Sequence, residues 1–130
     1  MSRVSAIPAA SSAEAVRHFE SEFAFETDCS DVHDALASHD ADFALLDVRS
    51  PGLFAAGHVP GAISLPYAKI TAGGLATWPE ATLFVVYCAG PHCNAAARAA
   101  LRLALLGRPV KLMAGGMTGW ADEGFAVERG

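Results

Sequence analysis

The chain has 130 residues, a formal net charge of −5 and an isoelectric point near 5.4, with 52% hydrophobic and 18% charged residues. This composition is typical of one globular domain with a buried core and excludes an intrinsically disordered chain. The negative charge argues against electrostatic binding to nucleic acid or to an anionic membrane. No apolar run reaches the roughly 18 residues that a membrane-spanning helix needs. The N-terminus lacks the apolar core of a secretory signal, so we expect a cytoplasmic protein.

The N-terminal residues 1–22 are expected to form an arm and a helix outside the main body of the protein. Residues 1–10 are small and almost uncharged, which is typical of a frayed terminus. Ser11 and Glu14 have the spacing of a capping box, which predicts a helix from about Ser12 to Phe23. We therefore assign residues 1–22 to this arm and helix, and residues 23–130 to the main domain.

The main domain is predicted to alternate strands and helices. Three continuous apolar runs, at 43–48, 83–88 and 110–113, predict strands buried on both faces, and 24–26 and 62–65 are shorter candidates. Asp28 or Ser30 is expected to cap a helix that ends near Ser38. An Ala- and Leu-rich helix is predicted at 94–106, ending before Gly107. Strand–helix–strand units of this kind imply a parallel sheet with right-handed crossovers.

One loop joins a buried strand to the Ala-rich helix and begins with a cysteine. Its sequence is Cys88, Ala89, Gly90, Pro91, His92, Cys93 and Asn94. Ligands of open parallel sheets bind beyond the carboxyl ends of the strands, where Cys88 would lie. Loop amides and the N-terminus of the helix would favour a thiolate, so we expect the pKa of Cys88 to be lower than that of a free thiol. The residues alone leave open whether Cys88 is a nucleophile or a small buried side chain.

Three motifs in this order resemble those of the rhodanese family. They are Leu46-Asp47-Val48-Arg49 with Phe54 and Gly57-His58-Val59-Pro60-Gly61-Ala62, then the loop from Cys88 to Asn94, then Gly115-Gly116-Met117-Thr118-Gly119-Trp120. The resemblance implies a rhodanese-like α/β fold over residues 23–130, with a central parallel five-stranded sheet and helices on both faces. It also implies a sulfurtransferase, in which sulfane sulfur moves from a thiosulfate- or persulfide-type donor to Cys88 as a persulfide. A thiol, cyanide or a protein cysteine would then accept the sulfur, and no cofactor would be needed.

The resemblance also suggests roles for the residues around Cys88. The substrate-binding cradle would be formed by Ala89, Gly90, Pro91, His92, Cys93 and Asn94. Asp47, Arg49, His58 and Arg98 are expected to support the structure around the site and not to react. A metal site built from Cys88, His92 and Cys93 is not expected, because a structural zinc ion requires four ligands.

The loop departs from the family pattern at its sixth position. Many rhodaneses have an arginine there, whereas this chain has Cys93. Without a guanidinium group, we expect weak binding of the thiosulfate dianion. Cys93 could be a resolving thiol that forms a disulfide with Cys88, or a small residue that only packs against the helix. The alternative to an enzyme is a non-enzymatic persulfide carrier or a redox-responsive binding module that uses the same loop.

Overall fold

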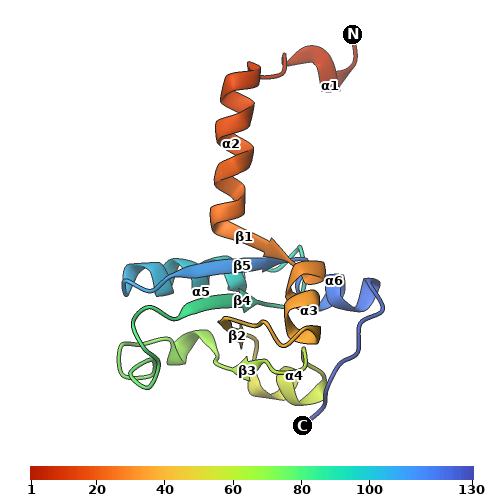
Figure 1. The fold of residues 1–130 in the computed structure, drawn as a ribbon. Helices are drawn as coiled ribbons and strands as arrows, with labels where there is room; N and C mark the ends of the chain where they lie inside the picture. Colours follow the sequence, from red (N-terminus) through yellow and green to blue (C-terminus); the bar gives the residue numbers. More distant parts are fainter.

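The computed structural model describes residues 1–130 and has an α/β fold built on a five-stranded parallel sheet of order β1-β5-β4-β2-β3 (Figure 1). The strands are β1 (Glu26–Asp28), β2 (Phe43–Asp47), β3 (Ile63–Ser64), β4 (Leu83–Tyr87) and β5 (Val110–Ala114). The helices are α1 (Arg3–Ala6), α2 (Ser12–Phe25), α3 (Cys29–Ala37), α4 (Pro51–Ala56), α5 (Ala95–Leu105) and α6 (Gly116–Asp122), with a 3-10 helix, η1 (Tyr67–Lys69). The predicted fold class is confirmed.

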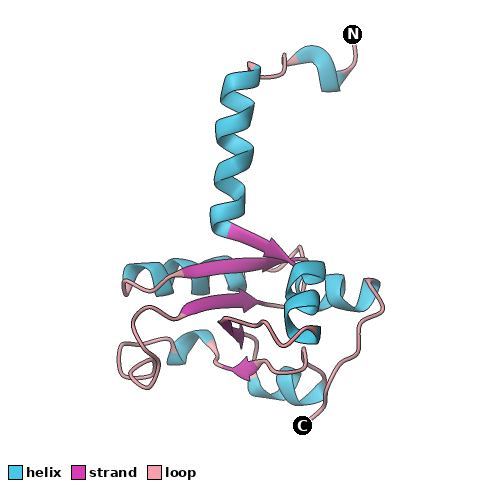
Figure 2. Ribbon diagram, in the orientation of Figure 1, coloured by secondary structure: helices cyan, strands magenta, loops and turns pink.

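The central strand β4 divides the hydrophobic core into two layers. Phe84, Val86 and Cys88 belong to one cluster, together with residues of α5. Val85 and Tyr87 belong to the other cluster, together with residues of α3 and α6. Because successive side chains of a strand point to opposite faces, β4 is covered by helices on both sides, as Figure 2 shows.

Local sequence signals account for most of the element ends. The Asp28 side chain accepts a hydrogen bond of 2.8 Å from the Asp31 amide, so it caps α3. Gly107 follows α5 and has a φ of 79°, in the left-handed region that glycine adopts easily, so the helix ends there. The prediction of a strand at 24–26 is wrong for its first two residues, because α2 continues through Phe25. Pairing with β5 begins only at Glu26, which lies opposite Leu112.

The helix α2 projects away from the sheet, and Figure 1 shows that only its C-terminal end approaches the body. Ser11 caps it through a bond from the Glu14 amide, as the sequence predicts. None of the residues in α1 or α2 is buried, and Phe19 and Phe23 are 56% and 71% exposed. No helix of the structure combines the length and the apolar character needed to cross a membrane.

Residues 1–22 should therefore contribute little to the stability of the rest of the chain. Deleting them should change the free energy of unfolding by no more than about 0.5 kcal/mol, because changes away from buried contacts usually stay within this range. Thermal and urea unfolding of residues 23–130, compared with the full chain, would measure this. A loss of several kilocalories per mole would show that α2 is packed against a partner in solution.

Candidate active site

Cys88 lies directly after β4, at the carboxyl edge of the sheet, and is only 3% exposed. It forms part of the wall of a hollow of about 360 Å³ between the Cys88–Asn94 loop, α5 and the end of β5. The hollow is lined by Glu26, Cys88, Gly90, Pro91, Cys93, Asn94, Ala96, Ala97, Leu112, Met113, Ala114, Gly115 and Gly116. A second hollow of about 420 Å³ at the base of α2 contains no cysteine, so we place the candidate chemistry at Cys88.

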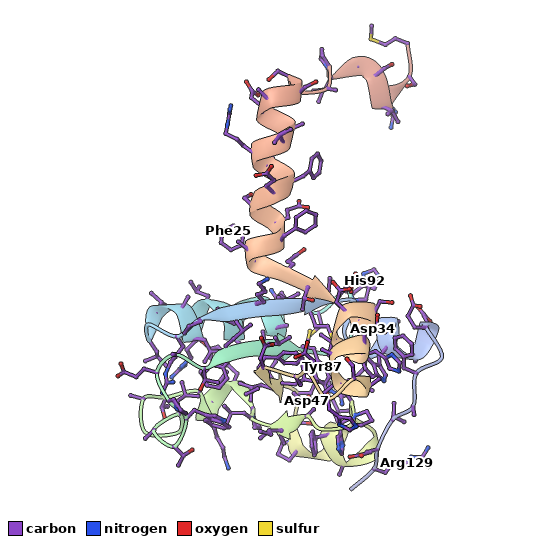
Figure 3. All side chains as sticks on the ribbon, in the orientation of Figure 1. Phe25, Asp34, Asp47, Tyr87, His92 and Arg129 are labelled. Atoms are coloured by element: carbon purple, nitrogen blue, oxygen red, sulfur yellow. The ribbon has the colours of Figure 1, made fainter.

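The predicted cradle residues are only partly gathered around this hollow. Gly90, Pro91, Cys93 and Asn94 line it, whereas Ala89 and His92 do not. Figure 3 shows His92 at the outer edge of the body, and its side chain is exposed. The loop therefore presents mainly small side chains and backbone groups to the hollow, and the imidazole of His92 does not line it.

The first turn of α6 holds the first residues of the loop. The amide of Met117 donates to the carbonyl oxygen of Cys88 at 3.0 Å, and the amide of Thr118 donates to that of Ala89 at 2.9 Å. A Cβ atom on Gly116 would lie 2.4 Å from the Cys88 carbonyl oxygen, and Gly116 has a φ of 57°. Only glycine fits this contact. Gly116 was not among the predicted site residues, although the Gly115-Gly116 pair in the sequence is a signal for such a close backbone contact.

A buried polar network, which includes Asp47 and Tyr87 (labelled in Figure 3), lies on the face of the sheet opposite Cys88. The carboxylate of Asp47 is fully buried and accepts hydrogen bonds from Arg49 Nη2 at 2.7 Å and from Tyr87 Oη at 2.8 Å. Arg49 Nη2 also donates to the carbonyl oxygen of Gly57, and Tyr87 Oη accepts from the amide of Val59. The hydrogen bond with Asp47 raises the pKa of Arg49, and burial raises that of Tyr87. This network joins β2 and β4 to the 57–59 turn.

His58 and Arg98 lie away from the hollow. His58 stacks on Phe54 with 3.7 Å between ring centroids, and its Nε2 lies 3.6 Å from a carboxylate oxygen of Glu128. Arg98 is exposed on α5, where it lines a separate groove with Tyr67 and Leu101. Neither side chain is placed to contact a substrate at Cys88.

The N-terminus of α5 faces both cysteines of the loop. Burial raises the pKa of the Cys88 thiol, the side chain of Cys93 raises it further, and the amides of Ala96 and Gly90 oppose this. The amide of Ala95 lowers the pKa of Cys93, whose side chain is exposed, and a hydrogen bond from Cys88 lowers it too. The expectation that the pKa of Cys88 is lowered is therefore wrong for the resting thiol, because desolvation outweighs the amides.

The charges around the hollow are unfavourable to an anion. Glu26 is the charged residue among those that line it, and no lysine or arginine does so. The third cysteine, Cys29, is buried on the other face, where its Sγ donates to the carbonyl oxygen of Ala114 at 3.5 Å. The structure contains no group of three or more His, Cys, Asp or Glu side chains arranged to hold a metal ion.

The parallel sheet, the cysteine loop at its carboxyl edge and the glycine turn that supports this loop define a rhodanese-type domain. The chain belongs to the rhodanese-like domain family, whose model matches residues 28–123. The crystal structure of the BH2092 protein from Bacillus halodurans has 33% identity and a TM-score of 0.88, and the match covers 92% of this chain and 87% of that one. A rhodanese-like domain protein from Staphylococcus aureus, at 24% identity and a TM-score of 0.68, shares the fold over 82% of this chain and 98% of its own.

A relative with a longer chain is the HTH-type transcriptional regulator Rv0324 of Mycobacterium tuberculosis. It is 37% identical over 89 residues, which are 68% of this chain and 39% of the regulator. The matched region thus spans well under two thirds of that relative.

The difference between the two loop cysteines can be tested by alkylation. Since Cys93 is exposed and its pKa is lowered, iodoacetamide at neutral pH should modify Cys93 well before Cys88 or Cys29, as followed by peptide mapping. In Cys93→Ser, the pH midpoint for alkylation of Cys88 should shift downward, because the Cys93 side chain raises the pKa of Cys88. Faster modification of Cys88 than of Cys93 in the unchanged protein would contradict this assignment.

Proposed function

We propose that this protein is a sulfurtransferase that carries sulfane sulfur as a persulfide on Cys88. The Cys88 thiolate attacks the outer sulfur of the donor, and the remainder of the donor leaves. With thiosulfate, the S–S bond of the donor breaks, sulfite leaves with the bonding electron pair, and Cys88 becomes a persulfide anion. A thiol, cyanide or a protein cysteine then takes the outer sulfur, and the Cys88 thiolate is regenerated.

The observation that carries this proposal is the position of Cys88 between the strand end and the first turn of α5. Its thiol is next to the amide of Ala96, which offsets part of the rise in the Cys88 pKa that burial causes. The hollow beside Cys88 has room for an outer sulfur atom and for part of a donor. Backbone amides at a helix N-terminus stabilise an anion without a cofactor, and we expect none to be required. Residues 23–130 would form the sulfur-transfer unit.

The donor that the hollow favours is a thiol persulfide. Thiosulfate carries two negative charges, and the hollow offers Glu26 and no cationic side chain to receive them. The protein as a whole has a net charge of −5, which also disfavours the approach of a dianion. A persulfide donor places less charge in the hollow, so it should be the better substrate.

A second candidate is a non-enzymatic persulfide carrier or redox-responsive binding module. The likeness to a transcriptional regulator, of which the matched region is a minor part, favours this role. Turnover separates the two: an enzyme cycles with small-molecule donor and acceptor, whereas a carrier is loaded and unloaded only by its protein partner.

Intact-protein mass spectrometry after incubation with a donor tests the proposal directly. A mass increase of one sulfur atom, located on the Cys88 peptide, is expected with glutathione persulfide and, at higher concentration, with thiosulfate. Cys88→Ser should fold normally and lose both the adduct and sulfur transfer to cyanide, because its hydroxyl has no anionic form at neutral pH. The Cys29→Ser variant is the matched control and should keep both. Full activity of Cys88→Ser would refute the proposal.

The absence of an arginine at position 93 of the loop should raise the KM for thiosulfate. Cys93→Arg is expected to lower the KM for thiosulfate on the order of tenfold relative to Cys93→Ser, since about 1.4 kcal/mol of added charge-assisted binding corresponds to this factor. The serine variant controls for loss of the thiol. Equal KM values in the two variants would show that the charge at this position does not limit thiosulfate binding.

A further inference from the structure

Both loop cysteines line the same hollow, and the thiol of Cys88 contacts the backbone of Cys93 there. Cys88 Sγ donates to the carbonyl oxygen of Cys93 at 3.3 Å, and the Cys93 amide donates to the carbonyl oxygen of Gly90 at 3.1 Å. The second bond folds the loop back over Cys88. Both cysteines line the hollow, but Cys88 is buried and Cys93 is exposed. A donor that reaches Cys88 is therefore bound beside a second thiol.

We propose that Cys93 resolves the Cys88 persulfide by forming a Cys88–Cys93 disulfide and releasing hydrogen sulfide. This activity rests on the proposed function, because it starts from the same persulfide. The Cys93 sulfur bonds to Cys88 Sγ, the bond between Cys88 Sγ and the outer sulfur breaks, and the outer sulfur takes the electron pair. The Cys93 thiol gives its proton to the outer sulfur, so the attacking group is the Cys93 thiolate and the outer sulfur leaves as hydrosulfide. Two cysteine sulfurs are oxidised to the disulfide while the sulfane sulfur is reduced to sulfide.

The geometry favours attack on the inner sulfur of the persulfide. Cys88 Sγ, which would become this inner sulfur, already contacts the backbone carbonyl oxygen of Cys93. The outer sulfur would extend into the hollow that both cysteines line. Attack on the inner sulfur expels hydrosulfide, whose acid is stronger than an alkyl thiol, and a group of lower pKa leaves faster. The lowered pKa of Cys93 also raises its thiolate fraction above that of a free cysteine, and the thiolate is the form that attacks.

The loop can make the movement that disulfide formation needs. The two sulfurs must approach to about 2 Å. Residues 91–94 are exposed, and Asn94 makes no side-chain capping bond to α5, so no buried contact of their side chains holds them in place. Cys29 cannot compete, because its thiol lies in the other core cluster. An external thiol reductant can then reduce the disulfide by attacking the exposed sulfur of Cys93, which returns both cysteines to thiols.

The experiment is a single turnover of the reduced full-length protein with excess thiosulfate in thiol-free buffer. Sulfide is trapped with monobromobimane and the protein is analysed by non-reducing peptide mapping. The unchanged protein and the control variant Cys29→Ser should each release close to one equivalent of sulfide and show a disulfide between the Cys88 and Cys93 peptides. Cys93→Ser should release no sulfide and should retain the extra sulfur atom on Cys88.

The outcomes separate this inference from the proposed function. An adduct on Cys88 in Cys93→Ser that is equally long-lived in the unchanged protein, without sulfide or disulfide, would overturn the resolving role and leave the sulfurtransferase intact. An extra sulfur atom on Cys93 would also overturn it, because it would mean attack on the outer sulfur. The absence of any adduct on Cys88 in Cys93→Ser, with either thiosulfate or glutathione persulfide, would instead refute the proposed function.

Discussion

The contact between the Gly115–Thr118 turn and the backbone of Cys88 is the constraint on which the candidate site depends. The carbonyl oxygens of Cys88 and Ala89 accept hydrogen bonds there from the amides of Met117 and Thr118. Because these two carbonyl groups are held by hydrogen bonds, the residues that follow them in the loop turn toward α5. A side chain on Gly116 would occupy the space of the Cys88 carbonyl oxygen, so the contact exists only between bare backbones.

The alternation of side chains along β4 places Cys88 and the buried polar network on opposite faces of the sheet. Tyr87 points to the face where Asp47 and Arg49 form the buried ion pair, and Cys88 points to the face of α5. A buried carboxylate without partners would be costly, but Asp47 receives hydrogen bonds from an arginine, a tyrosine and a backbone amide. These hydrogen bonds hold the end of β4 from the face opposite Cys88. The Cys88 thiol therefore needs no polar partner outside the loop.

Sequence patterns predicted the long buried strands and α5 well, because continuous apolar runs and an Ala-rich segment ending at glycine are strong local signals. The loop as the candidate site was equally visible, since its cysteine follows a strand. The boundary between α2 and β1 was not predictable, because it lies where pairing with β5 begins, at Glu26, and the propensity of residues 24–25 does not reveal that pairing. The direction of the Cys88 pKa shift was predicted wrongly for a similar reason. Burial by residues distant in sequence raises this pKa, and the sequence of the loop does not reveal that burial.

The pKa of Cys88 is raised and that of Cys93 is lowered, which is consistent with different roles for the two thiols. A buried thiol of raised pKa is mostly protonated at rest and is protected from random oxidation, which requires the thiolate. In the proposed reaction, a second sulfur atom on Cys88 would move the negative charge outward by one bond, from the desolvated position into the hollow. The burial that disfavours the Cys88 thiolate would then act less strongly on the persulfide anion. The site would thus stabilise the loaded state relative to the empty one, while the exposed Cys93 remains the thiol that meets solvent first.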